Sequence, residues 1–167
     1  MRTWEKYLNK QLYSECQLVT AINAYYYLTG KTIKQDSQEY EDLVDLVKAR
    51  SGSAICIEKA YEKLGLITLK KEEWLWGLWD ERKLLLPIGA TIWHKKTGFH
   101  SVAIVDHCPK TDCIRVPNFR AVTSTDGWMF REDFYQYETR ITQGDDGFNT
   151  KGKQWRYRVF GLKGKKK

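Results

Sequence analysis

The pattern of apolar and polar positions divides the chain into a helical first half and a second half rich in strands. Helices are predicted where apolar residues recur every three or four positions, over residues 14–28, 37–48, 53–64 and 72–83. Strands are predicted where β-branched or aromatic runs lie between turn residues, at 66–69, 88–93, 99–106, 113–116 and 155–162. A short helix is predicted within 127–137. This order predicts an α+β fold in which N-terminal helices pack on an antiparallel sheet.

The first predicted helix has a well-defined start that places a cysteine at its N-terminal end. Ser14, followed three residues later by Gln17, forms a capping box, and Gly30 supplies a left-handed stop. Cys16 therefore lies in the first turn. At such a position the helix dipole and the free N–H groups lower the pKa of a thiol, so Cys16 is a candidate nucleophile.

The net charge of +7 comes from the C-terminal end of the chain. Residues 151–167 contain eight Lys or Arg and no acid, which leaves 20 of the 28 basic residues against all 21 acids in residues 1–150. We therefore divide the chain into a nearly neutral domain, 1–150, and a basic C-terminal strand and tail, 151–167. The tail suggests a nucleic-acid or other anionic partner, although a solvated chain end explains the same composition.

Length and composition narrow the class further. A chain of 167 residues is most simply one globular domain, and a domain of this size buries roughly 70% of its unfolded surface. No apolar run approaches the ~20 residues of a membrane span, and the N-terminus lacks the apolar region of a signal peptide. Four cysteines without a secretory signal do not indicate a disulfide scaffold. A cytoplasmic location is expected.

Three further residues support a thiol chemistry for Cys16. His100 interrupts an otherwise apolar strand and is a candidate general base. Asn118 follows the next strand, where its side-chain carbonyl is able to orient the imidazole. Gln11 lies shortly before the cysteine, and its amide N–H is a candidate oxyanion donor beside the backbone N–H of Cys16.

The register of the hairpin between the two strands decides whether the asparagine side chain reaches the histidine. A three-residue loop, 109–111, places Asn118 on the face of His100. A four-residue loop places Cys108 opposite Cys113 and Asn118 opposite Ala103, on the other face. Both registers are open from the sequence.

Six stretches of the chain resemble the papain-like cysteine peptidases, most closely the branch that cleaves double-glycine leader peptides of bacteriocins. They are residues 11–16, 57–65, 86–89, 98–105, 116–118 and 128–134. The resemblance implies a papain-like α+β fold with Cys16 as nucleophile, His100 as base, Asn118 as orienting residue and Gln11 as oxyanion donor. It implies a peptide or protein substrate, an acyl-enzyme mechanism, and no cofactor or metal.

Other functions remain open. A papain-fold structural or assembly protein, such as a bacteriophage virion component, would carry the same motifs without turnover. A nucleic-acid-associated protein would act through the basic tail. His107, Cys108 and Cys113 are too few and too irregularly spaced to predict a zinc site, whereas a hairpin disulfide between the two cysteines is more plausible. In the tryptophan-rich stretch 74–79, one helical face is expected to pack in the core and Trp76 to face outward; the core face consists of Trp74, Leu75, Leu78 and Trp79.

Overall fold

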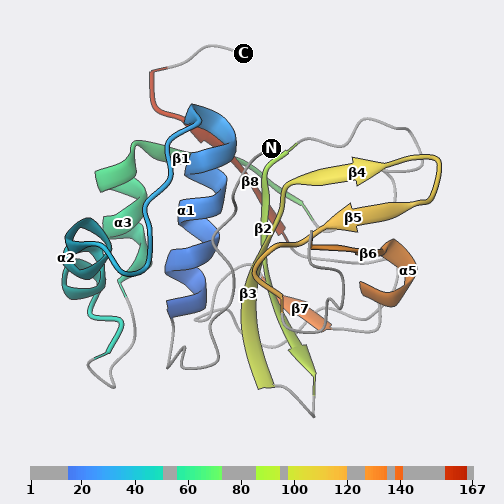
Figure 1. Ribbon diagram of the computed structural model, residues 1–167, viewed down its shortest axis with the longest axis horizontal. Helices are drawn as coiled ribbons and strands as arrows, with labels where there is room; N and C mark the ends of the chain where they lie inside the picture. The colour runs from blue at the N-terminus through green and yellow to red at the C-terminus, as the bar shows by residue number, and fades with distance from the viewer. Residues whose placement is uncertain are drawn as a thin grey trace.

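The structure is a computed structural model that describes residues 15–50, 56–72, 86–94, 98–119, 127–134, 138–140 and 157–164. Three helices, α1 (Glu15–Thr29), α2 (Gln38–Val47) and α3 (Ile57–Leu64), lie together beside two antiparallel sheets (Figure 1). The predicted α+β class is therefore confirmed.

Each of the three helices is followed by a residue with a left-handed backbone, and this residue is glycine after α1 and α3. Gly30 and Gly65 follow α1 and α3 with φ of 77° and 72°. The start of α2 is capped by Ser37, whose side chain accepts the N–H of Tyr40 at 3.2 Å. Lys48 ends α2 with a φ of 61° and donates its backbone N–H to the preceding turn. Helix boundaries in this half of the chain thus follow from local chemistry.

The larger sheet contains five of the described strands. Its order is β1 (Leu66–Glu72), β8 (Tyr157–Leu162), β2 (Ile88–His94) and β3 (Gly98–Ile104), with β7 (Glu138–Arg140) also paired to β2. In the β2–β3 pair His100 lies opposite Ile92. Among the described strands of this sheet, β3 pairs only with β2. It is therefore an edge strand.

The strand β8 lies between β1 and β2 (Figure 1). Val159 and Phe160 are completely buried, and Val159 lies opposite Ile88. The predicted strand at 155–162 is confirmed over 157–162. Six of the seventeen residues of the segment 151–167 therefore form a strand of the larger sheet, and removing them would take out the strand between β1 and β2.

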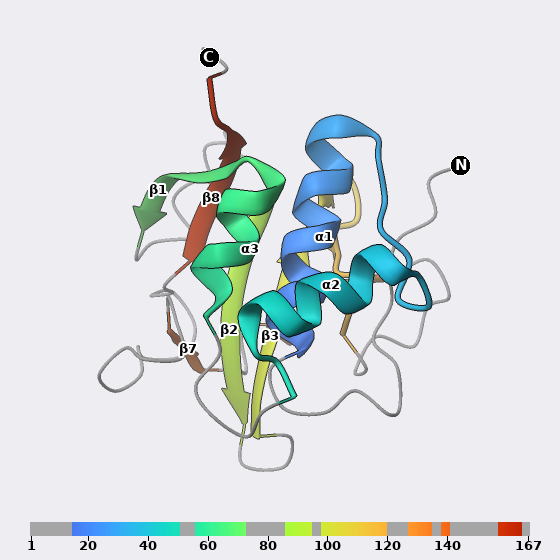
Figure 2. The same ribbon diagram turned by 90° about the vertical axis from the view of Figure 1, so that its left-hand side faces the viewer.

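The helices cover one face of the larger sheet, with α1 nearest to β3 (Figure 2). Ala21 and Ala24 of α1 pack with Leu66 and Phe160, so small residues on the helix allow close approach to the strands. The helices also share their own core, in which Leu18, Ile22, Tyr40, Leu43 and Val44 are buried. A fully buried Leu or Ile side chain contributes about 1.5–3 kcal/mol, so this packing holds α1 firmly in place.

A smaller sheet extends from the end of β3. It contains β4 (Asp106–Cys108), β5 (Cys113–Arg115) and β6 (Trp128–Phe130), followed by the short helix α5 (Arg131–Phe134). The predicted single strand over 99–106 is therefore divided, because Val105 leaves the larger sheet and its N–H bonds to Arg115 O at 3.0 Å. Cys108 lies opposite Cys113, so the four-residue loop is the one that forms.

The prediction of a helix over 127–137 is only partly correct. Residues 128–130 form a strand because they pair with β5, and the Arg115 guanidinium lies 5.7 Å from the centre of the opposite Trp128 ring. Gly127 has a φ of 87°, and a Cβ there would lie 3.1 Å from the backbone of Pro117. Among the described residues of this range, 127–134, only 131–134 are helical. Pairing between distant segments therefore prevails over local helix propensity here.

Several predicted features lie outside the described residues. These include Gln11, the capping Ser14, the start of the third helix and the tryptophan-rich stretch 74–79. Of the helix predicted over 72–83, only Glu72 is described, and it is the last residue of β1 rather than a helical residue.

Candidate active site

Cys16 lies in the first turn of α1, as predicted, with its sulfur against β3. Only 8% of the residue is exposed. The backbone N–H of Ser101 donates a hydrogen bond to Cys16 Sγ at 3.4 Å. A contact across 85 positions of sequence therefore places the thiol beside the residue that follows His100.

The pKa of Cys16 differs from the sequence-based expectation. Burial raises the pKa of this thiol, and the opposing hydrogen bonds from Ser101 and from the backbone of Gln17 and Cys16 do not compensate. The helix N-terminus alone predicted a lowered value. Removal from water penalises the thiolate more than the first-turn position stabilises it. In the free protein the thiol form is favoured.

His100 is held on two sides by consecutive residues. Its Nε2 atom lies 2.6 Å from the backbone carbonyl oxygen of Asn118. The ring also stacks on Phe119, with centroids 5.8 Å apart and an interplanar angle of 25°. A carbonyl oxygen only accepts hydrogen bonds, so Nε2 carries the proton. In the neutral ring Nδ1 then carries no proton and is the basic nitrogen.

Asn118 contacts His100 through a different atom from the one that the sequence suggested. Its side-chain Oδ1 accepts the N–H of Ala103 at 3.0 Å, and its Nδ2 donates to Ser101 O at 3.0 Å and to Thr20 Oγ1 at 3.1 Å. The side chain is therefore fully engaged away from the imidazole. The four-residue hairpin loop explains this, because it sets Asn118 opposite Ala103 rather than on the face of His100.

One face of α1 touches both parts of the site. Thr20 lies one turn after Cys16, so the two side chains project from the same side of the helix. Cys16 contacts the backbone of Ser101, and Thr20 contacts the side chain of Asn118. The structure thus gathers the segments that carry Cys16, His100 and Asn118. Gln11 lies outside the described residues.

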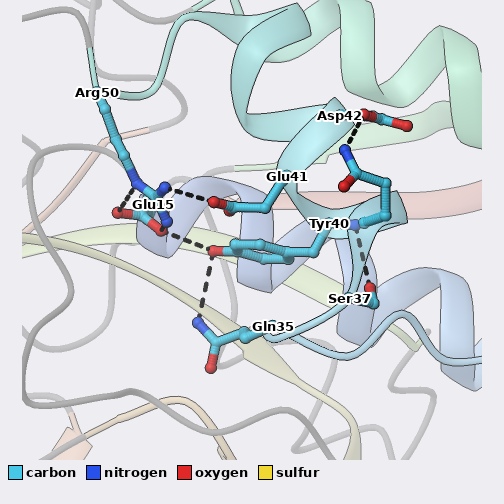
Figure 3. Close-up of polar contacts among 8 residues, drawn as sticks. Glu15, Gln35, Ser37, Tyr40, Glu41, Asp42 and Arg50 are labelled. Atoms are coloured by element: carbon cyan, nitrogen blue, oxygen red, sulfur yellow. Dashed lines mark hydrogen bonds and ion pairs between the residues drawn. The ribbon is translucent and has the colours of Figure 1, made fainter.

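An ion pair between a buried carboxylate and a half-exposed arginine anchors the start of α1. Glu15, directly before the cysteine, accepts hydrogen bonds from Arg50 Nε at 3.1 Å, Arg50 Nη2 at 3.0 Å and Tyr40 Oη at 3.0 Å (Figure 3). Arg50 Nη1 also bonds to Glu41 at 2.9 Å. Desolvation is the main cause of the raised pKa of Tyr40, which stays a donor. The negative charge beside Cys16 is therefore matched by a cation.

Three contacts of the site were not predicted from the sequence. Helical spacing points to Thr20, because it lies four residues after the candidate nucleophile. Phe119 directly follows Asn118 in the chain, yet nothing in a single sequence shows that its ring meets His100. The Ser101 amide is a backbone group, so residue identity carries no signal of its contact with sulfur.

The described residues give no indication of a metal centre or a membrane helix. Among them, no three His, Cys, Asp or Glu side chains are grouped so as to hold a metal ion. His107 instead contacts Asp112, with Nε2 3.0 Å from Oδ1. None of the helices described is both long enough and apolar enough to cross a membrane.

Comparison of the chain with protein-family models, with curated proteins and with solved structures finds no match. A functional assignment therefore depends on the chemistry of the site. A buried thiol and an oriented imidazole on neighbouring elements are the components of a nucleophile and its general base.

Proposed function

We propose that this protein is a cysteine-dependent amide hydrolase, a peptidase with a papain-like arrangement of nucleophile and base. The observation that carries the proposal is the way His100 is held. With Nε2 directed to the Asn118 carbonyl, Nδ1 is the basic nitrogen, and in this proposal it takes the proton of the thiol. Cys16 lies against the residue next to this histidine, at the N-terminal end of a helix.

In the proposed reaction His100 Nδ1 removes the proton from Cys16 as the sulfur attacks the substrate carbonyl. Formation of the C–S bond gives a tetrahedral intermediate. Its oxyanion accepts hydrogen bonds from the backbone N–H of Cys16 and from the side-chain amide N–H of Gln11. Collapse breaks the C–N bond, and the imidazolium gives its proton to the leaving amine. Water, activated by the same imidazole, then hydrolyses the thioester and frees Cys16.

The raised pKa of Cys16 determines how this chemistry starts. Because burial favours the thiol, proton transfer accompanies the attack on the carbonyl rather than preceding it. A correctly placed base is then essential, since little thiolate exists without it. The stacking of His100 on Phe119 and its bond to Asn118 support the proposal because they hold the ring in one orientation.

The proposed substrate is a peptide or protein, and the reaction requires no cofactor or metal. Thiol, imidazole and hydrogen-bond donors together provide nucleophile, acid, base and oxyanion stabilisation. The arrangement also supports the papain-like fold, with the nucleophile on a helix that packs on the strand carrying the base.

A mixed peptide library tests this proposal. The wild-type chain is expected to generate new peptide termini by mass spectrometry, and Cys16→Ala and His100→Ala are expected to generate none. Cys56→Ala is the matched control, because Cys56 precedes α3 and has no part in the site. If folded wild-type protein cleaves no peptide, the assembly-protein alternative is favoured instead.

A further inference from the structure

The hairpin between β4 and β5 brings two cysteines directly opposite each other. Cys108 and Cys113 form the last cross-strand pair before the loop, and both are partly exposed free thiols. Opposed residues in an antiparallel ladder have Cα atoms about 4.5 or 5.5 Å apart, according to the type of pair. Both separations fall in the range of about 4.4–6.8 Å that a disulfide spans.

We propose that Cys108 and Cys113 are a redox-active dithiol that a low-molecular-weight disulfide, such as oxidised glutathione, converts reversibly into a cross-strand disulfide. The pair is independent of the proposed hydrolase site, because neither Cys16 nor His100 takes part in the oxidation of Cys108 and Cys113. It is therefore a second reactive site of the molecule.

The hairpin loop prepares one of the two thiols for attack. Hydrogen bonds from the side chain and then the backbone of Thr111 lower the pKa of Cys108, assisted by Lys110. Cys113 Sγ contacts the backbone carbonyl of the same Thr111 at 3.8 Å. One loop residue thus touches both sulfurs. Thr111 therefore stabilises the thiolate of Cys108 and also contacts Cys113, the resolving thiol.

The loop is also held in shape by contacts that the disulfide would not disturb. Asp112 adopts a left-handed backbone, with a φ of 54°. Its carboxylate bonds to His107 at 3.0 Å and to Arg131 Nη2 at 2.8 Å, and its carbonyl accepts the N–H of Arg131. The two strands are thereby fixed in register, so closing the disulfide requires little further ordering of the backbone.

The reaction balances without any other reagent. Cys108 thiolate attacks one sulfur of oxidised glutathione, breaks its S–S bond and releases one glutathione thiolate, which takes up the proton lost by Cys108. Cys113 then gives up its proton and attacks Cys108 Sγ, which releases the second glutathione. Two protein thiols are oxidised, and one glutathione disulfide is reduced to two thiols.

Proteolysis and mass spectrometry of the full-length chain test the proposal. The protein is treated with oxidised glutathione, quenched with acid, alkylated and digested with trypsin. Cleavage after Lys110 separates residues 97–110 from 111–115, so the two peptides remain joined only if the disulfide has formed. The expected product is this joined pair from monomeric protein, lost on addition of dithiothreitol. Intermolecular disulfides, or equal cross-linking to Cys16 or Cys56, would overturn the proposal.

Three variants test the order of attack. Cys113→Ser is expected to accumulate glutathione on Cys108, and Cys108→Ser is expected to acquire it more slowly on Cys113. Thr111→Val removes the hydroxyl donor but keeps the loop, and should slow glutathionylation of Cys108 roughly threefold near neutral pH. Equal rates in the two serine variants, or an unchanged rate in Thr111→Val, would contradict the role assigned to Cys108.

Discussion

The Nε2 atom of His100 lies 2.6 Å from the backbone carbonyl oxygen of Asn118, and the Asn118 side chain bonds elsewhere. The contact that orients the proposed base therefore does not depend directly on the identity of the side chain at position 118. That side chain instead ties together α1, β3 and the segment after β5. Its role is to hold the carbonyl in place.

Asn118→Ala is expected to reduce stability more than chemistry. The substitution removes three buried hydrogen bonds, which at roughly 1 kcal/mol each should lower the free energy of unfolding by about 3 kcal/mol. Peptide cleavage by the folded fraction should persist within about tenfold, because the carbonyl remains. Urea titration and kinetics at low temperature measure the two effects. Normal stability with abolished activity would show that the side chain itself orients His100.

Two threonines provide a matched pair of substitutions for the hydrogen bond between α1 and Asn118. Thr20→Val removes one of the two acceptors of Asn118 Nδ2, leaves its bond to Ser101 O, and should cost about 1 kcal/mol in urea titration. The hydroxyl of Thr32 is buried with no hydrogen-bond partner in the part of the chain that the structure describes. Thr32→Val should therefore be neutral or stabilising. Equal losses in both variants would rule out a specific role for Thr20.

The ion pair between Arg50 and Glu15 is expected to contribute more to stability than the exposed pair between Arg50 and Glu41. Arg50→Met leaves the buried Glu15 carboxylate without its cation and should lower stability by about 2 kcal/mol, a value reduced because the Arg50 side chain is 47% exposed. Glu41→Gln removes only the exposed pair and should cost under about 0.5 kcal/mol. A double-mutant cycle with Glu15→Gln measures the coupling. No coupling would contradict the anchoring role.

Asp112 predicts a pH-dependent contribution to stability. Partial burial opposes ionisation, but hydrogen bonds from His107 and Arg131 outweigh it, so the pKa of this carboxyl is lowered. A lowered pKa stabilises the fold above the ordinary carboxyl value, and the contribution is lost as pH falls through the folded value. Asp112→Asn, which also tolerates a left-handed backbone, should cost about 1 kcal/mol at neutral pH.

Unfolding titrations at several pH values check this. The difference between Asp112→Asn and the wild type should shrink below the ordinary carboxyl pKa of about 4. A difference that stays constant across this range would show that the charge of Asp112 contributes nothing.

Local chemistry was sufficient to predict the helices α1, α2 and α3 over most of their described length. The cap at Ser37 and the stops at Gly30 and Gly65 act through neighbouring backbone groups, so their effect is visible in a short stretch of sequence. The strands at 88–93 and 155–162 were predicted from β-branched and apolar runs, which are also visible in a short stretch of sequence. What the sequence did not show was that the last strand lies between β1 and β2, which depends on pairing across the whole chain.

The sequence singled out candidate residues for the site but did not predict the contacts that these residues make. Cys16, His100 and Asn118 stand out by type and position, but the bond from His100 to the Asn118 backbone depends on a hairpin register that two loop lengths left open. The pKa of Cys16 depends on burial, which results from packing of α1 on the sheet. Glu15 and Arg50 are 35 residues apart, so no short stretch of the sequence indicates that they pair.

Acylation of Cys16 by a peptide p-nitrophenyl ester is the most direct test of the central claim that this thiol and His100 act together. Wild-type protein should release p-nitrophenol in a burst and carry the acyl group on Cys16, as identified by peptide mass spectrometry. His100→Ala should lower the acylation rate at least about a hundredfold, and Cys56→Ala should leave it unchanged. Acylation of Cys16 at an equal rate in His100→Ala, or acylation at another residue, would contradict the account.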